Sequence, residues 1–311
     1  MPMTILNPTA SDHTSLTDRF RGALIGLAVG DALGTTVEFR PRGSFERVTD
    51  MIGGGPFQLQ AGQWTDDTSM ALCLAASLAE CGGFNPGDQM ARYVRWYREG
   101  YMSATGTCFD IGNATRDALT RFERRGDPFA GSTDPHSAGN GCLMRLAPVP
   151  MAFFGDIDQA GDYSAESART THGALECVEA SRLFGRILHR ALAGNDKAAI
   201  LSGDAELPFT APAIAALSQG AYAGKPQAAI FGSGYVVQSL EAALWCFQRT
   251  ETYAEAVLMA VNLGDDADTT AAICGQLAGA FYGLSGIPAA WRERVSRYAL
   301  LQDMADALLP A

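Results

Sequence analysis

Two short segments of the chain place paired carboxylates beside threonine hydroxyls, directly before an apolar run. Residues 64–68 have the sequence WTDDT, and residues 264–270 have the sequence GDDADTT. Both segments offer only hard oxygen donors, the ligands that Mg²⁺ and Mn²⁺ prefer. The first segment alone has a simpler interpretation: Thr65 can cap a helix, and acids in a first helical turn suit the positive end of the helix dipole.

The two segments together are harder to explain without a metal ion. Helices packed through small residues would bring both acidic N-termini around one cavity, where four carboxylates repel one another strongly. A helix dipole stabilises charge by only about 0.3–1 kcal/mol at each end, too little to hold them. One or two divalent cations would suffice, and a two-metal site with ions about 3.5–4 Å apart fits the donors. The residues gathered in this way are Thr65, Asp66, Asp67, Asp266, Asp268 and Thr269.

The elements that must position these donors begin with a glycine-striped helix. From Ser15 the pattern is helical and carries glycine at positions 22, 26, 30 and 34. Because glycine costs about 1 kcal/mol per helical position relative to alanine, such a stripe indicates that another backbone approaches closely. Glycines 275, 279 and 283 repeat this spacing after the second acidic segment. Asp31, inside the first stripe, could reach a neighbour or a site.

The rest of the chain also favours helices. Residues 35–63, which hold Glu38, and residues 126–142 are expected loops, and no convincing alternating strand appears. We predict an all-α protein with a flexible tail over residues 1–14 and one domain over 15–311. Further helices are expected over about 86–98, 113–124, a stretch ending near 192, 235–247, 252–262 and 288–307.

Composition excludes several classes of protein. Of 311 residues, 47% are hydrophobic and 18% charged, and the net charge of −11 argues against nucleic-acid binding. Seven cysteines without a CxxC pair, and only four histidines, disfavour a zinc–thiolate site. The cysteines fit small buried hydrophobes in a reducing compartment. With no signal peptide and no membrane span expected, the predicted location is the cytoplasm.

Several segments, in order, resemble the ADP-ribosylglycohydrolase family. They are residues 22–38 (GALIGLAVGDALGTTVE), 64–72 (WTDDTSMAL), 139–148 (GNGCLMRLAP), 171–172 (TH) and 264–283 (GDDADTTAAICGQLAGAFYG). Each motif alone is modest, but the combination is highly specific. The resemblance implies a single compact orthogonal helical bundle and two divalent cations, Mg²⁺ or Mn²⁺. It gives the metal-binding role to the six residues named above.

The resemblance also implies roles outside the metal ligands. Glu38 matches a loop glutamate that binds metal or water, and Asp110 matches an aspartate that faces the reacting bond in the arginine-directed branch. Asp265 is an extra acid where the family often has glycine, and we do not expect it to be a ligand. The ADP-ribose-binding residues implied by the match are Ser137, Gly139, Asn140, Gly141, His172, Gly234 and Tyr235.

The function implied by this family is hydrolysis of the glycosidic bond between ADP-ribose and a protein side chain. Arginine is favoured as the acceptor because of Asp110, and ADP-ribose would be the product. Asp67 or Glu38 would take the proton from water, and Asp110 could hold or protonate the guanidinium nitrogen. The expected partner is an ADP-ribosylated protein, with no nucleic acid and no membrane, and the enzyme is expected to be a monomer.

Simpler or different interpretations stay open at this point. Asp110 could cap a helix, His172 could be a satisfied cap or core residue, and Tyr235 could be a half-buried aromatic. A serine or O-acyl linkage could replace arginine. A two-metal phosphohydrolase would usually add Lys or Arg for the phosphate, and Arg145 is the one such residue in these motifs. A non-catalytic ADP-ribose binder should lose ligands, whereas this chain keeps every ligand motif.

Overall fold

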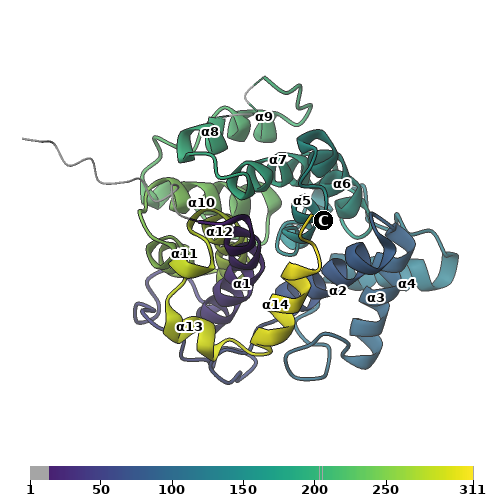
Figure 1. The fold of residues 1–311 in the computed structure, drawn as a ribbon, viewed down its shortest axis with the longest axis horizontal. Coiled ribbons are helices and arrows are strands. Elements are labelled where there is room, and N and C mark those ends of the chain that lie inside the picture. The colour runs from purple at the N-terminus through teal and green to yellow at the C-terminus, as the bar shows by residue number, and fades with distance from the viewer. Residues whose placement is uncertain (1–13, 203, 205, 311) are drawn as a thin grey trace, which may run out of the picture.

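The computed structural model describes residues 14–202, 204 and 206–310, and within them every regular element is a helix (Figure 1). The predicted all-α class is confirmed, because the described residues form only isolated β-bridges and no strand. Apart from Thr14, the predicted flexible tail lies outside the described residues.

The longer helices agree closely with the ranges predicted from the sequence, and short 3₁₀ turns lie between some of them. The α-helices are α1 (Leu16–Gly34), α2 (Asp66–Cys81), α3 (Pro86–Glu99), α4 (Asn113–Arg125), α5 (Pro148–Ala152), α6 (Ile157–Arg169), α7 (Leu175–Leu192), α8 (Lys197–Ser202), α9 (Pro212–Ser218), α10 (Val236–Gln248), α11 (Tyr253–Val261), α12 (Ala267–Tyr282), α13 (Ala289–Arg294) and α14 (Tyr298–Asp306). The 3₁₀ turns are η2 (Thr35–Val37), η3 (Pro135–Ser137), η4 (Asn140–Cys142), η5 (Gln227–Ala229) and η6 (Leu284–Gly286).

The glycine stripes form the centre of the fold, where α1 packs along α12 (Figure 1). A Cβ atom at Gly26 would overlap the carbonyl oxygen of Gly275, and one at Gly34 would overlap that of Ala267. The two helices therefore run antiparallel with their backbones in contact, as the stripes predict. This pairing sets the C-terminal end of α1 beside the N-terminal end of α12, and so brings the loop after α1 to the second acidic segment.

Two expectations about secondary structure need correction. The single last helix over 288–307 is wrong: α13 and α14 are separated at residues 295–297, where Arg297 adopts a left-handed backbone with φ of 55°. Thr65 does occupy the position before α2, but its side chain makes no capping hydrogen bond. The reason is that the Thr65 hydroxyl points to carboxylates instead.

The cysteines, the apolar helices and the core were also subjects of prediction. Five cysteines are buried as small apolar side chains, whereas Cys81 is exposed and Cys108 half-buried. Among the described residues, no helix is both long and apolar enough to cross a bilayer. A continuous core of buried apolar side chains extends from Phe20 in α1 to Leu308 after α14.

Candidate metal centre and substrate cavity

The first acidic segment is fixed by a carboxylate from α1. Asp31 accepts hydrogen bonds from the backbone N–H and the hydroxyl of Thr65, both 2.9 Å long. It also accepts from the backbone N–H of Thr68 at 3.1 Å and from the Thr68 hydroxyl at 2.6 Å. Asp31 thereby does for the first turn of α2 what a side-chain cap would do. Asp31 was expected to reach a neighbour or a site but was not among the predicted site residues; its signal in the sequence was an acid within a stripe of glycines.

The two acidic segments meet at Asp268. Its carboxylate lies with those of Asp31 and Asp67 in one group, in which one oxygen atom from each residue lies within 4.8 Å of the others. A second group with the same spacing consists of Asp268, Glu38 and Asp110. The Thr65 hydroxyl is 3.2 Å from Asp67 Oδ2 and 3.4 Å from Asp268 Oδ2. Residues about two hundred positions apart are thus assembled around one point.

The loop that carries Glu38 is tied to the second acidic segment through backbone hydrogen bonds. Phe39 N–H donates to the carbonyl of Asp265 at 2.7 Å, and Asp265 N–H donates to the carbonyl of Arg40 at 2.8 Å. Asp265 has a φ of 57°, a left-handed conformation that favours glycine but that aspartate tolerates. That explains why an acid can stand where the family often has glycine.

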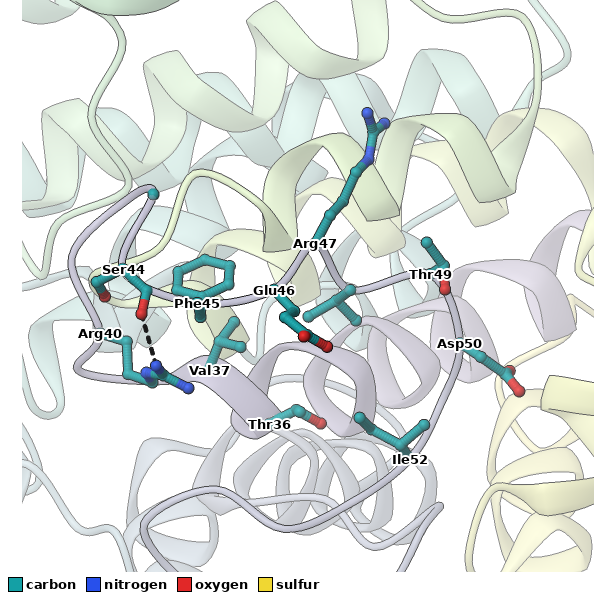
Figure 2. A pocket seen from close by; sticks show the side chains of 12 residues that line it. Thr36, Val37, Arg40, Ser44, Phe45, Glu46, Arg47, Thr49, Asp50 and Ile52 are labelled. Carbon is teal, nitrogen blue, oxygen red and sulfur yellow. Dashed lines mark hydrogen bonds between the residues drawn. The ribbon is translucent and has the colours of Figure 1, made fainter.

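The remainder of this loop turns away and encloses a separate hollow of about 750 Å³ (Figure 2). There Arg40 donates to the carbonyl of Ser44 at 2.7 Å, and its guanidinium lies 5.6 Å from the centre of the Phe45 ring. This hollow is lined by charged, apolar and small polar residues of the segment 36–52 and by none of the predicted ligands. The predicted ligands that line a cavity, including Glu38, therefore line a different one.

Asp110 belongs to the site and does not cap a helix. The residue before α4 is Gly112, and Asp110 has a φ of 59° in the preceding segment. A non-glycine residue in this left-handed region is strained and is often held so at functional sites. Here the strained backbone turns the carboxylate toward Glu38 and Asp268.

A turn from the opposite side of the cavity contacts the second acidic segment directly. Asn140 Nδ2 donates to Asp266 Oδ2 at 2.6 Å and to Ser239 Oγ at 2.7 Å. The backbone N–H of Asn140 donates to Gly234 O, and Val236 N–H donates to Ala138 O. The predicted substrate-binding turn and the start of α10 are therefore joined to each other and to Asp266.

The other predicted substrate residues take different positions. His172 is buried against Gly139 and Gly141 and faces the cavity. Tyr235 is 37% exposed, donates its hydroxyl to Glu176 at 2.7 Å and lines a neighbouring hollow with Gly139 and Gly234. Ser137 donates to Asp134 O at 2.7 Å and is not among the described residues that line either space.

These residues surround a cavity of about 710 Å³. Four residues that were not predicted as site residues also line it: Phe39, Asn113, Thr115 and Met144. Among the described residues, the lining contains no Lys or Arg. Its acidic side chains are Glu38, Asp66, Asp110, Asp265, Asp266 and Asp268.

Electrostatics of the cavity favour a bound cation. Burial, reinforced by Asp110 and Asp266, raises the pKa of Glu38 to about 9. Burial, reinforced by Asp31 and Asp266, raises the pKa of Asp110 to about 8. The pKa values of Asp66, Asp67 and Asp268 are also well above the ordinary range, with burial as the largest cause.

The donors fit a divalent metal. Asp67 Oδ1 is buried and has no hydrogen-bond partner, so one strong acceptor is left over after the protein's own donors are used. Carboxylates that repel one another at this spacing gain most from a positive ion between them. The acid clusters can therefore hold a metal ion, as the sequence predicts.

Fold and cavity together define a class: an all-α protein whose carboxylates converge beneath an open cavity that has no cationic lining. The chain belongs to the ADP-ribosylglycohydrolase family, whose model matches residues 12–311. It is thus an enzyme of a hydrolase family, and the resemblance seen in the sequence is confirmed.

Known relatives agree with this assignment. An ADP-ribosylarginine hydrolase Tri1 of Pseudomonas putida is 47% identical over 94% of this chain and 78% of its own length. An ADP-ribosyl-[dinitrogen reductase] glycohydrolase of Rhodospirillum rubrum is 33% identical over 95% of this chain and 97% of its own. A solved structure described as an ADP-ribosylglycohydrolase-related protein complex superposes with a TM-score of 0.84 at 45% identity, covering 94% of this chain and 97% of that one.

Proposed function

We propose that this protein hydrolyses the N-glycosidic bond between ADP-ribose and an arginine side chain of a protein, and so reverses mono-ADP-ribosylation. The observation that carries the proposal is the convergence of Asp67 and Asp268 with Asp31, within 4.8 Å, from two helix starts far apart in sequence. Two relatives named ADP-ribosylarginine hydrolase, 47% and 41% identical, support arginine as the acceptor. The activity would belong to one domain over residues 15–311, acting as a cytoplasmic monomer.

We infer that two divalent cations, Mg²⁺ or Mn²⁺, are held by Thr65, Asp66, Asp67, Asp266, Asp268 and Thr269. When bound, such ions supply Lewis-acid charge that holds the vicinal hydroxyls of a ribose and acidifies a water molecule. The Thr65 hydroxyl has one proton, and its shortest acceptor is Asp31 at 2.9 Å. A lone pair of the Thr65 oxygen is thereby left for the metal.

Substrate orientation is assigned to the turn that contacts Asp266. Asn140, Gly139 and Gly141 line the cavity, and glycine lets a ligand approach the backbone closely. His172 and Gly234 lie beside this turn, and Tyr235 borders the adjoining hollow. Because Asn140 donates a hydrogen bond to Asp266, the groups that bind ADP-ribose would be held in a fixed position relative to those that bind metal.

Cleavage of the bond builds oxocarbenium character at the anomeric carbon, and a water molecule must then lose a proton. Of the two candidate bases, Glu38 lines the cavity, whereas Asp67 is fully buried beneath it. We therefore assign the base to Glu38 and keep Asp67 as a ligand. Asp110 would hold the guanidinium of the leaving arginine and return a proton to its nitrogen, because a carboxylate fits that planar fork.

A two-metal phosphohydrolase is the weaker alternative. Such an enzyme would place a cationic side chain against the phosphate. Arg145, the one candidate in the motifs, is fully buried and its Nη2 donates to Thr171 Oγ1 at 2.6 Å. It is thus committed to the protein interior.

The test is a panel of substrates in which ADP-ribose is joined to arginine, serine or an O-acyl group, each assayed with Mg²⁺ and with Mn²⁺. We expect release of ADP-ribose from the arginine linkage, and a selective loss of that activity in Asp110→Asn. Equal turnover of all three linkages would contradict the arginine assignment. Cleavage of free ADP-ribose at its diphosphate bridge, to AMP and ribose 5-phosphate, would favour the phosphohydrolase.

A further inference from the structure

Arg145 is a buried cation near the substrate turn, the segment of residues 139–141 that lines the cavity. It is not one of the catalytic or ligand residues assigned above. Arg145 has no exposed surface, and among the described residues no carboxylate forms an ion pair with it. Its guanidinium lies 4.8 Å from the centre of the Tyr93 ring and contacts Met70 Sδ at 3.9 Å. A charge buried without a counter-ion is costly and calls for a function.

Among the described residues, the shortest hydrogen bond of Arg145 leads toward the cavity. Its Nη2 donates to Thr171 Oγ1 at 2.6 Å, and the same oxygen is 2.8 Å from His172 Nδ1. His172 Nε2 lies at the other end of the imidazole, against Gly139 and Gly141 of the substrate turn. Arginine, threonine and histidine therefore form one chain from the core to the cavity.

This chain selects one form of the imidazole. Arginine can only donate, so Thr171 Oγ1 must accept from Arg145. If His172 Nδ1 also donated to Thr171, the threonine proton would have no acceptor among the described residues, although Thr171 is fully buried. An unpaired buried donor is unfavourable. The Thr171 hydroxyl therefore donates to Nδ1, and the ring proton must be on Nε2.

The same surroundings keep the ring neutral. Burial, followed by the nearby Arg145 charge, lowers the pKa of His172 to about 3. Nε2 therefore presents a permanent N–H to the cavity rather than an acceptor or a titrating cation. Such a donor suits an oxygen of a nucleotide ligand in a cavity whose described lining contains acids but no Lys or Arg.

We propose that Arg145 and Thr171 are positioning residues that fix His172 as an Nε2–H donor to an oxygen atom of the bound ADP-ribose unit. The proposal rests on the proposed function for the identity of the ligand. The Thr171 hydroxyl would thus contribute to ligand specificity without touching the substrate. Without that hydroxyl, His172 Nε2 could lose its proton to Nδ1 and present an acceptor to the cavity instead of a donor.

The experiment uses the full chain labelled with ¹⁵N-histidine, with the His172 signals assigned by their loss in His172→Gln. In the wild-type protein we expect the ¹⁵N shifts to show protonated Nε2 and unprotonated Nδ1, without change between pH 5.5 and 8.5. In Thr171→Val we expect a mixture of tautomers and an affinity for free ADP-ribose about tenfold weaker, the size of one hydrogen bond. The affinity for Mn²⁺ should not change.

Two control variants distinguish the loss of the Thr171 hydroxyl from a general destabilisation of the fold. Thr171→Ser keeps the hydroxyl and should bind ADP-ribose within about twofold of wild type. Thr170→Val removes the adjacent, equally buried hydroxyl, which bonds to Gln89 and Ser167 instead, and should also bind normally. A wild-type His172 protonated on Nδ1 would overturn the proposal even if Thr171→Val did not fold, as would unchanged ADP-ribose affinity in that variant. If wild type binds ADP-ribose in this way but does not cleave the arginine linkage, the proposed function fails and this inference stands.

Discussion

The two acidic segments have similar sequences, but the protein supports them differently. Asp66 and Asp67 follow a threonine that is fixed from behind by Asp31, and all of these side chains are buried. Asp266, by contrast, is partly exposed and accepts a hydrogen bond from the Asn140 side chain in the substrate turn. One segment is anchored to the core and the other to the turn that we propose binds ADP-ribose.

This difference indicates a division of labour. Support from the core fixes donor geometry, and outer partners of that kind are worth about 10–100-fold in metal affinity. Support from the substrate turn couples the metal donors to whatever that turn binds. Substitution of Asp31, which supports the first segment, should therefore alter metal binding. Substitution of Asn140, which supports the second segment, should alter substrate binding.

The largest effect is expected where the two segments meet. Asp268→Asn removes the carboxylate shared by both acid groups, so we expect kcat for ADP-ribosyl-arginine to fall on the order of a thousandfold. Thermal stabilisation by Mn²⁺ should be lost as well. Asp265→Asn is the matched control: it changes the extra acid of the same segment, and asparagine tolerates the left-handed backbone found there. Undiminished turnover in Asp268→Asn would refute the assigned site.

The next effect isolates the support of the first segment. Asp31→Asn places an amide N–H against donors of Thr65 or Thr68, so the affinity for Mn²⁺ should fall about 10–100-fold. Calorimetric titration measures this directly. Asp18→Asn is the control, because it changes an acid on the same helix that bonds to Ser285. If Asp31→Asn weakened ADP-ribose binding but spared the metal, the division of labour would be reversed.

The fold and the convergence of the two acidic segments could largely be predicted from sequence because they depend on short-range patterns. Helical periodicity and the glycine stripes indicated α1 and α12, and the acid–threonine motifs indicated the donors. The role of Asp31 could not be predicted, since its partners are 34 and 37 positions away. Nor could the left-handed turn at Asp110, where a helix cap was the local alternative.

A smaller effect is expected in front of the second segment. Asn140→Ala removes the bond to Asp266 and loosens the substrate turn, so KM should rise about tenfold, the size of one hydrogen bond to a charged group. Its affinity for Mn²⁺ should change less than that of Asp31→Asn. Ser239→Ala, which removes only the other partner of Asn140, should have a weaker effect on KM. Equal losses of metal affinity in Asn140→Ala and Asp31→Asn would remove the distinction between the segments.

The smallest effect is a pH dependence of stability that the metal should reverse. The pKa of Glu38 is about 9 and that of Asp110 about 8, against ordinary values of 4.5 and 3.8. Between about pH 4 and pH 9 the folded protein therefore binds protons that the unfolded chain has released, so the free energy of unfolding falls as pH rises. We expect the Tm of EDTA-treated protein to decrease by several degrees from pH 5 to pH 8. Arginine-paired acids such as Asp204, whose pKa is lowered, act mainly below this window.

Protein saturated with Mn²⁺ is the comparison for this last effect. Cations compete with protons for the same carboxylates, so the gain in Tm from Mn²⁺ should grow as pH rises through the same range. Asp31→Asn should show a reduced gain at every pH, whereas Asn140→Ala should keep most of it. A Tm of the EDTA-treated protein that rises from pH 5 to pH 8 would mean that the folded protein binds fewer protons than the unfolded chain in this range. The raised pKa values, and the repulsion between carboxylates that they reflect, would then be absent.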